Sequence, residues 1–404
     1  MRVLHIQAQL PSHTGSGIYF SNVVKGLKGK VEQAVVYGAW PGYTWDILPQ
    51  AKQYPCLFPN EEAAFPMPGM SDVMPYETSI YGDMTPAMLQ AWKNSFASVI
   101  KEAVAQFQPD VILCHHLWLL TAQVAATYPW HTVWAISHGT DIRQAQQHPD
   151  LVNEYLDGLK QLDRVFLLSA EQIRDVEAIF KLPTGRLSVL GSGFDAEIFY
   201  LPKEKPATPL RVIYAGKIAE AKGVYASIAA FKQLEDLAVE YHLYGNGDVA
   251  SLKRLREAIG KDTRIYYQGA VPQTKLAEAM RASHIFLLPS YYEGLPLVIA
   301  EAMACGCYAI VGPFPALKAS LAEPLMDAGL VEYVTLPPLK NADEPLPEAV
   351  PAYERRLMKA LETQVKRVQA KPKLAWEMEP LITSHSWAAL IDTLEIELKK
   401  VSCP

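Results

Sequence analysis

Short apolar segments alternate with amphipathic segments along most of this chain. Apolar runs bounded by glycine, proline or polar clusters predict strands, and apolar residues that recur at helical spacing predict the helices between them. In the first half the pattern predicts strands at Val3–Ala8, Val111–Cys114, Thr132–Ser137 and Arg164–Ser169, and helices at Gly17–Leu27 and Pro86–Phe107. Strands that alternate with helices are typical of parallel sheets with helices on both faces.

The alternation restarts after Leu201–Pro209, whose prolines and mixed charges predict a linker. The predicted strands are then Arg211–Ala215, Glu240–Tyr244, Arg264–Gln268 and Ile285–Leu288, and the predicted helices are Val224–Leu234, Val249–Ile259, Thr274–Arg281 and Leu297–Ala304. We therefore expect an α/β fold with two Rossmann-like domains facing across a cleft, at residues 1–200 and 210–383. A last helix around Trp387–Leu398 should cross back, so that residues 384–404 pack on the N-terminal domain.

Composition narrows the class of protein. The 404 residues are 50% hydrophobic and 20% charged, which is typical of a well-packed soluble protein of about two domains. The net charge of −6 argues against a general nucleic-acid binder. The five cysteines form no pair with metal-ligand spacing, which indicates free thiols in a reducing compartment.

The chain shows no membrane-spanning pattern. No apolar run approaches the roughly 20 residues that a membrane span needs, and the N-terminus has the pattern of a strand rather than of a signal peptide. We expect a cytoplasmic protein. Lys25, Lys28 and Lys30 leave association with an anionic membrane surface open, although a solvated helix end explains them as well.

The most informative motif is Tyr292–Gly306, in which Glu293 and Glu301 enclose an apolar run. Glu293 follows a predicted strand, and Glu301 lies in the helix that begins near Leu297. Backbone N–H groups of the loop and the helix N-terminus favour an anion, while the two carboxylates can accept hydrogen bonds from hydroxyls. This combination suits a sugar nucleotide. Two exposed glutamates beside an ordinary amphipathic helix are the alternative if the pair is considered alone.

The motif, with its Ala-Met-Ala-x-Gly tail, resembles the signature of family 4 retaining glycosyltransferases of GT-B architecture. The resemblance implies that Glu293 contacts the transferred sugar and that Glu301 contacts the ribose of the nucleotide. It also implies that the donor-binding loop and helix start consist of Gly294, Leu295, Pro296 and Leu297. The family's Gly-Gly-x-Pro-Glu continuation is replaced here by Gly312–Ala316, so specificity could differ.

Two lysines follow the strand that ends at Ala215. Lys217 and Lys222, next to Gly216 and Gly223, could stabilise the charge that grows on a departing diphosphate. The resembled family usually has arginine at the position of Lys217, and a lysine loses the bidentate fork. Two surface lysines at a strand end are the alternative.

Three further positions belong to loops that bind the nucleotide in the resembled family. Gly245 and Asn246 form a turn at the end of a strand, and main-chain groups near Val271 would recognise the base. Each could also be a plain turn.

In the N-terminal domain, Gly15, Ser16 and Gly17 open the first helix and would let a phosphate or an acceptor approach the backbone. Phe20 stands where a dinucleotide fingerprint needs glycine, which disfavours a nicotinamide dehydrogenase. Ser16 departs from the adjacent glycines of the resembled family. The irregular segment Tyr43–Met84, rich in proline and aromatic residues, is expected near the acceptor.

Ser137–Asp141 resembles the His-Gly-Thr-Asp loop of several family 4 enzymes, including those that glycosylate malate. The resemblance places His138 beside the transferred sugar as a neutral imidazole. His115, at a strand end, is a candidate for the acceptor side. Asp141 is a second candidate there, although capping a helix or orienting the loop is the favoured role for it. His115 could equally well be structural.

No cluster of histidines and carboxylates and no Asp-x-Asp element indicates a metal, and no serine or cysteine has an activated context. We expect no cofactor and no metal. The predicted activity is retaining transfer of a hexosyl group from a UDP-sugar to a small-molecule, glycan or lipid-linked acceptor. The alternatives are a GDP-mannose-dependent mannosyltransferase, an epimerase or phosphorylase of the same fold, and a non-catalytic sensor of sugar nucleotides.

Overall fold

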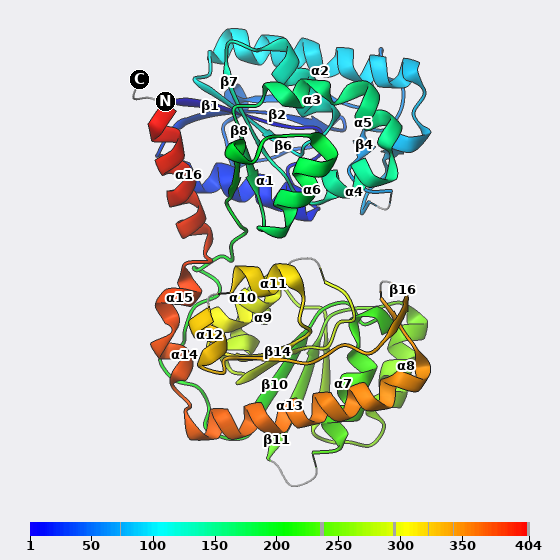
Figure 1. The fold of residues 1–404 in the computed structure, drawn as a ribbon, viewed down its shortest axis with the longest axis vertical. Coiled ribbons are helices and arrows are strands. Elements are labelled where there is room, and N and C mark those ends of the chain that lie inside the picture. Colours follow the sequence, from blue (N-terminus) through cyan, green and yellow to red (C-terminus); the bar gives the residue numbers. More distant parts are fainter. Residues whose placement is uncertain (73, 235–237, 294–295, 322, 342, 402–404) are drawn as a thin grey trace. The chain divides into compact units, whose positions relative to one another are not determined.

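The structure is a computed structural model that describes residues 1–72, 74–234, 238–293, 296–321, 323–341 and 343–401. The chain forms two compact units (Figure 1). Unit 1 comprises Met1–Ser192 and the C-terminal residues from Leu390 on, and unit 2 comprises Gly193–Ala389. Each unit has its own apolar core.

Unit 1 is built on a seven-stranded sheet in the order β3-β2-β1-β6-β7-β8-β9, and every pairing in it is parallel. Its strands are β1 (Arg2–Gln7), β2 (Glu32–Ala39), β3 (Gln53–Leu57), β6 (Val111–His115), β7 (Thr132–Ile136), β8 (Arg164–Leu167) and β9 (Leu187–Val189), with β4 (Pro68–Gly69) and β5 (Ser79–Ile80) paired separately. Its helices are α1 (Gly15–Gly26), α2 (Pro86–Phe107), α3 (Leu119–Thr127), α4 (Thr140–Gln147), α5 (Pro149–Tyr155) and α6 (Glu171–Phe180).

Unit 2 has a six-stranded parallel sheet in the order β12-β11-β10-β13-β14-β15. The strands are β10 (Leu210–Ala215), β11 (Val239–Tyr244), β12 (Ile265–Gly269), β13 (Ile285–Leu288), β14 (Tyr308–Val311) and β15 (Val331–Tyr333), and β16 (Leu339–Asn341) pairs with β17 (Glu344–Pro345). The helices are α7 (Val224–Lys232), α8 (Val249–Ile259), α9 (Gln273–Arg281), α10 (Leu297–Ala304), α11 (Pro315–Ser320), α12 (Glu323–Asp327), α13 (Val350–Ala370), α14 (Leu374–Glu377) and α15 (Glu379–Thr383).

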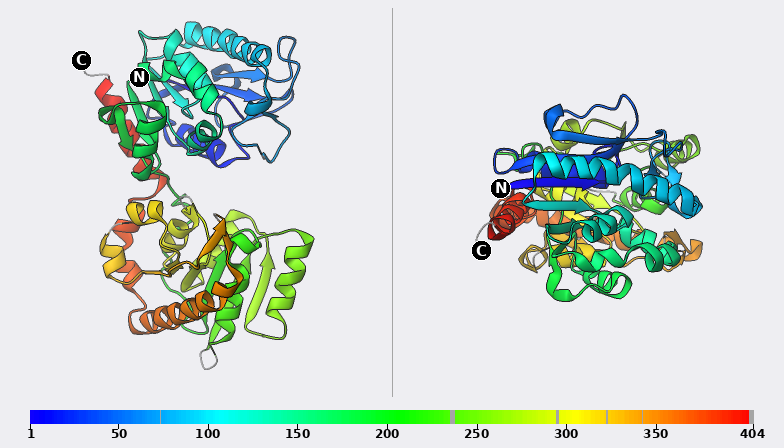
Figure 2. Two further views of the ribbon diagram at one scale, coloured as in Figure 1. Left: turned by 45° about the vertical axis from the view of Figure 1, so that its right-hand side comes forward. Right: turned by 90° about the horizontal axis from the view of Figure 1, so that it is seen from above.

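Both sheets have the doubly wound order, in which the chain leaves the central strand first to one side and then to the other. The strands are short and apolar throughout, and every residue of β6 and of β13 is buried. Such strands need helices on both faces of the sheet. Figure 1 and the left view of Figure 2 show helices on both sides of each sheet. The predicted pair of Rossmann-like domains is confirmed.

The boundary between the units lies earlier than the predicted linker Leu201–Pro209. Phe194 and Phe199 are fully buried in the core of unit 2, together with Ile213 and Tyr214. Residues 193–200, which the sequence pattern assigned to the first domain, therefore belong to the second. Burial of the two phenylalanine rings in the second core favours this arrangement.

Helix α16 (Trp387–Val401) carries the chain back into unit 1 from Leu390 on. Lys30 forms ion pairs with Asp392 (2.9 Å) and Glu395, and Arg164 pairs with Glu397. Of the three lysines considered for membrane contact, Lys30 is thus bound to the C-terminal helix. No helix within the described residues is both long and apolar enough to cross a membrane.

Candidate active site

The predicted donor residues of unit 2 lie on loops at the carboxyl edge of its sheet. Central strand β10 pairs with β11 on one side and with β13 on the other, so the chain reverses its direction of winding between β10 and β13. Ligands of doubly wound sheets bind at this switch point. The loop after β10 supplies Gly216, Lys217 and Lys222, and the loop after β13 supplies Ser290 and Glu293.

Lys222 and Glu293 form an ion pair across the switch point. The Nζ of Lys222 donates to Oε1 of Glu293 at 2.8 Å, and Oγ of Ser290 donates to the same oxygen at 2.7 Å. Both side chains are partly exposed, 31% for Lys222 and 17% for Glu293, so both groups remain accessible to a ligand. Ser290 was not among the predicted site residues, although it lies only three positions before Glu293.

Gly223 allows the loop that carries Lys222 to pack against the loop that carries Glu293. Its φ is +63°, and a Cβ at this position would lie 2.0 Å from the backbone oxygen of Pro289. The N–H of Tyr291 donates to the carbonyl of Ala221 at 3.0 Å, which joins the two loops directly. Glycine is therefore required so that the lysine loop can pack against the glutamate loop.

Gly216 and Gly245 lie where the loop after β10 packs against the loop after β11. A Cβ on Gly245, whose φ is +139°, would lie 1.8 Å from the oxygen of Gly216. The N–H of Ile218 donates to the carbonyl of Asn246 at 2.8 Å, and the N–H of Gly245 donates to Gly269 at 2.9 Å. These contacts connect the loops after β10, β11 and β12. Lys217 is exposed on this edge.

Glu301 lies inside α10, one turn beyond the exposed Leu297. Burial raises the pKa of the Glu301 carboxyl to about 7, and the amide of Gln273, 3.4 Å away, opposes this effect. Gln273 begins α9, two residues after Val271. It was missed from the sequence because a single amide at a helix start has no distinctive pattern.

Helix α10 begins at Leu297 with buried Pro296 before it and without a side-chain cap. Its first N–H groups are therefore available to an anion. The predicted site residues Gly294 and Leu295 lie outside the described part of the chain.

In unit 1, Gly15, Ser16 and Gly17 form the first turn of α1, and Thr14 caps the helix by accepting from the N–H of Gly17 at 3.0 Å. A Cβ on Gly17 would lie 2.6 Å from the oxygen of Ser12, whereas a Cβ on Gly15 would meet nothing within 4 Å. The buried Gly17 is therefore needed for packing of its own loop. Of the two glycines, only Gly15 has the open surroundings that a binding role requires.

His138 contacts two other imidazoles of unit 1. Its Nε2 lies 3.0 Å from Nδ1 of His115, with the rings nearly parallel, and its ring centroid lies 4.7 Å from that of His116. Burial, and then the neighbouring imidazoles, lower the pKa of His115 and of His138 well below the ordinary value. Burial lowers the pKa of His116 to about 4. All three are neutral near pH 7, and His116 was not predicted.

Asp141 joins the loops that follow β6 and β7. The side chain is fully buried, and Oδ2 accepts from the N–H of Leu117 at 2.7 Å, while Oδ1 accepts from Oγ of Ser137 at 2.9 Å and from the N–H of Ile142 at 3.0 Å. These donors follow β6 and β7. The carboxylate is therefore occupied in joining the two loops that carry the histidines, which is the loop-orienting role considered for it.

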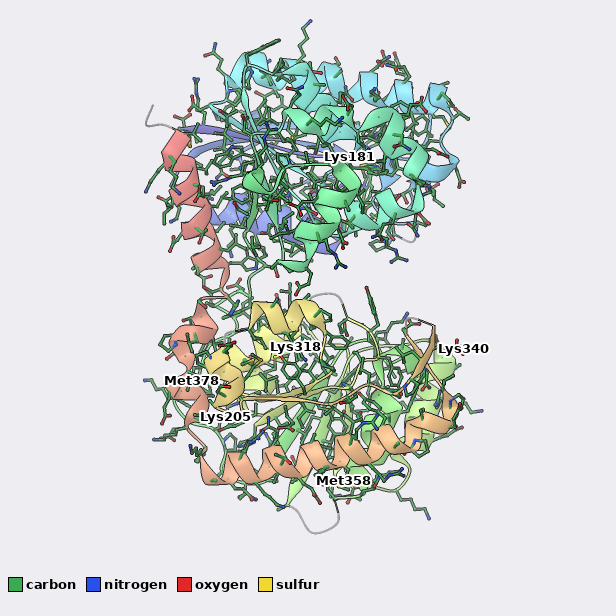
Figure 3. The ribbon with its side chains drawn as sticks, viewed as in Figure 1. Lys181, Lys205, Lys318, Lys340, Met358 and Met378 are labelled. Carbon is green, nitrogen blue, oxygen red and sulfur yellow. The ribbon has the colours of Figure 1, made fainter. Side chains whose placement is uncertain are left out.

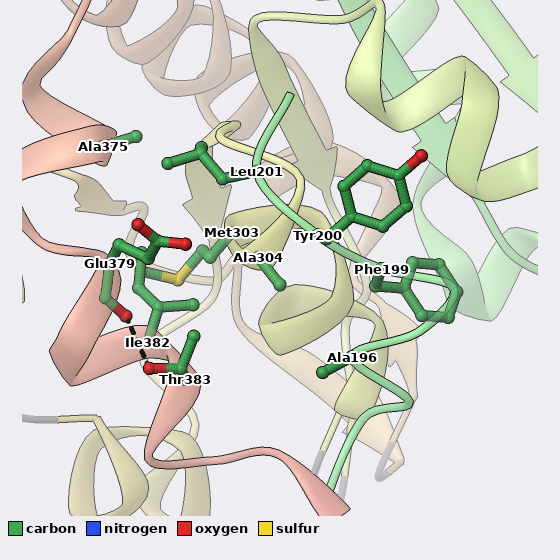
Figure 4. A pocket seen from close by; sticks show the side chains of 10 residues that line it. All are labelled: Ala196, Phe199, Tyr200, Leu201, Met303, Ala304, Ala375, Glu379, Ile382 and Thr383. Carbon is green, nitrogen blue, oxygen red and sulfur yellow. Dashed lines mark hydrogen bonds between the residues drawn. The ribbon is translucent and has the colours of Figure 1, made fainter. Parts of the chain in front are cut away.

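Unit 2 also contains a cavity of about 170 Å³ away from these loops. Phe199, Leu201, Met303 and Ile382 line it, and the carboxylate of Glu379 lies at its side (Figure 4). Nearby, Lys205, labelled in Figure 3, donates from Nζ to the carbonyl of Met280 at 3.2 Å. Within the described residues no group of histidines, cysteines and carboxylates could hold a metal ion.

Comparison with known proteins identifies a family that part of unit 2 resembles. The profile of the family "Glycosyl transferases group 1" matches residues 199–323, which include Lys217, Lys222, Glu293 and Glu301. WcaL of Escherichia coli, provisionally named a colanic acid biosynthesis glycosyltransferase, is 28% identical over 42% of this chain. The match covers 44% of the length of that relative. WcaL of Salmonella typhimurium is 24% identical over 75% of this chain and 75% of its own length.

Among solved structures, HepE of Anabaena in complex with UDP superposes with a TM-score of 0.64. The alignment covers 99% of this chain and 100% of that one at 14% identity, so it shows the fold. The matched profile, the relatives and this fold confirm the resemblance that the Glu293–Glu301 motif predicted. Residues 199–323 therefore match the group 1 glycosyl transferases, and the chain has the GT-B fold.

Proposed function

We propose that this protein transfers a hexosyl group from a UDP-sugar to an acceptor, with retention of configuration and without a metal ion. The observation that carries the proposal is the set formed by Lys222, Glu293 and Ser290 at the switch point of unit 2. A cation and a hydrogen-bonded carboxylate lie together there, next to the uncapped N-terminus of α10.

The chemistry follows from what each group can bind. When the bond between sugar and diphosphate breaks, negative charge grows on the leaving group, and the ammonium groups of Lys222 and Lys217 stabilise it most at that moment. The flexible stem of Lys222 allows its ammonium to move from Glu293 to a phosphate oxygen. Glu293 is then free to accept a hydrogen bond from a sugar hydroxyl.

Two further groups of unit 2 are suited to the ribose and the base of the nucleotide. The carboxylate of Glu301 can accept hydrogen bonds from both ribose hydroxyls, and the backbone near Val271 can recognise the base. HepE, which has the same fold, is described in complex with UDP and with UDP-glucose. We therefore propose UDP as the nucleotide of the donor. For unit 1 we propose that the neutral imidazole of His138 contacts the transferred sugar.

The decisive experiment measures UDP release from UDP-glucose and UDP-galactose with a mixture of glycan and small-molecule acceptors. We expect Lys222→Ala and Glu293→Gln to lower turnover at least 100-fold, since each removes an interaction made in the transition state. Lys275→Ala is the matched control, because its ion pair with Glu278 is exposed on α9. Circular dichroism should show all three variants folded. Near-normal turnover by Lys222→Ala would refute the site.

The same preparation separates the alternatives. A rise in melting temperature with UDP alone supports the proposed donor, and a stronger response to GDP would favour a mannosyltransferase. An epimerase would convert the UDP-sugar without an acceptor, and a phosphorylase would need phosphate. A sensor would bind UDP-sugar but release no UDP with any acceptor.

A further inference from the structure

Four aromatic side chains gather at the carboxyl edge of the sheet in unit 1. Trp40 directly follows β2, and His13 lies in the loop between β1 and α1. Because β1 and β2 are neighbouring parallel strands, these two residues meet at the same edge. Tyr43 and Tyr76 come from the irregular segment that follows. We call these four residues the aromatic cluster.

The rings contact one another closely. The centroid of Trp40 lies 5.5 Å from those of Tyr43 and Tyr76, and the ring of His13 is parallel to Trp40 at 6.5 Å. Edge contacts also join His13 to both tyrosines. The four rings therefore form one connected cluster, of which Trp40 and His13 are the exposed members.

The cluster is exposed at Trp40 and His13 and carries polar groups. Trp40 is 36% exposed and His13 is exposed, although a tryptophan of a soluble unit is usually covered. The hydroxyl of Tyr43 lies 2.6 Å from that of Ser12 beside the rings. His13 has a φ of +65°, which is uncommon for a residue with a side chain and is often found at binding sites.

The segments that build the cluster carry no cation. Residues 3–24, 31–51 and 53–92 contain neither lysine nor arginine, but residues 53–92 contain five carboxylates, Glu61, Glu62, Asp72, Glu77 and Asp83. The cap of α1 is occupied by the side chain of Thr14. An anionic acceptor would have no nearby positive partner from these segments. A neutral ligand with an apolar face and a hydroxyl edge suits them better.

We propose that the aromatic cluster is an acceptor subsite that holds a neutral sugar ring, with the C–H face of the pyranose on Trp40 and its hydroxyls at His13, Ser12 and Tyr43. This inference rests on the proposed glycosyl transfer and specifies its acceptor as an uncharged carbohydrate. It assigns the irregular segment after β2 to recognition of that acceptor.

The test uses saturation-transfer NMR on the full chain with methyl α-D-glucopyranoside, methyl β-D-galactopyranoside and methyl α-D-mannopyranoside, and with L-malate and inositol 1-phosphate as anionic probes. We expect ring-proton signals from at least one neutral glycoside and weaker signals from both anions. Trp40→Ala should weaken glycoside binding about tenfold, the scale of one lost stacking contact. Trp40→Phe should retain part of the binding.

Trp130→Ala is the matched control, because Trp130 is 75% exposed in unit 1 and precedes β7 at the opposite edge of the sheet. It should bind the glycosides as the wild type does. The proposal is overturned if Trp40→Ala and Trp130→Ala bind alike, or if the anions bind better than every glycoside. The UDP-induced rise in melting temperature tests donor binding separately, and Trp40→Ala should retain it.

Discussion

At the scale of single residues, the properties of the site depend on what surrounds each group. Glu301 is a glutamate in the middle of an apolar helix, and burial raises its pKa to about 7. The motif predicted its position but not its titration. Likewise, the sequence indicated His115 and His138 separately, and only the structure brings their ring nitrogens to 3.0 Å.

Glu301→Gln should stabilise the protein at alkaline pH. Because the pKa of Glu301 in the folded state is raised above its unfolded value of 4.5, its contribution is fully present below pH 4.5 and is lost as the pH rises through 7. The amide carries no charge and avoids this loss. We expect the free energy of unfolding of the variant to exceed that of the wild type by about 1–3 kcal/mol at pH 8.

The measurement is urea unfolding of both proteins at pH 4.5 and pH 8. The two should differ little at the lower pH. A stability difference that does not change between the two pH values would show that Glu301 titrates normally in the folded protein.

At the scale of elements, the sequence predicted several central strands and helices, but not β2, β14 or α13. The predicted limits of β13, α8 and α10 agree with the structure. It did not predict β3, an edge strand that contains Pro55, because proline removes a backbone donor and disfavours a strand assignment. Nor did it predict how closely the loops pack. A glycine is required there because a Cβ would clash with the backbone of a segment that is distant in the sequence.

Two glycines in the first turn of α1 test whether close packing requires glycine. Gly17→Ala should destabilise unit 1 by about 2–4 kcal/mol, because the new methyl group would lie within 2.7 Å of the backbone of Leu10 and Ser12. Gly15→Ala should leave stability within about 1 kcal/mol of the wild type, because its surroundings are open.

Thermal unfolding of both variants, together with UDP release, provides the readout. If Gly15 lets a ligand approach the backbone, Gly15→Ala should lower turnover while the melting temperature stays unchanged. Equal destabilisation by both substitutions would contradict the packing described for this loop.

At the scale of the whole molecule, two units of similar topology share one chain, and α16 returns to unit 1 after unit 2 is complete. Leu390, Ile391, Leu394 and Leu398 are its buried residues, and Gly26 of α1 lies against Ile391. The C-terminal helix is therefore part of the N-terminal fold.

Leu394→Ala should destabilise unit 1 by about 2–5 kcal/mol, since it leaves a cavity where a fully buried side chain packs. Ile396→Ala on the same helix is the control, because Ile396 is 57% exposed. Hydrogen exchange is the measurement, and amides of β1 and β2 should exchange faster in Leu394→Ala, whereas those of β10 and β11 should not. Faster exchange in β10 and β11 alone would contradict the assignment of α16.

The sequence by itself determined the alternation of strands and helices, the two Rossmann-like domains and the glutamate motif of the family, because periodicity and local motifs are properties of neighbouring residues. Only the tertiary structure decided where the units divide, that Lys222 pairs with Glu293, that Asp141 is buried in a loop junction, and that four aromatic rings meet beside α1. These features join residues far apart in the chain, and their free energies arise from burial and contact, which no local pattern records.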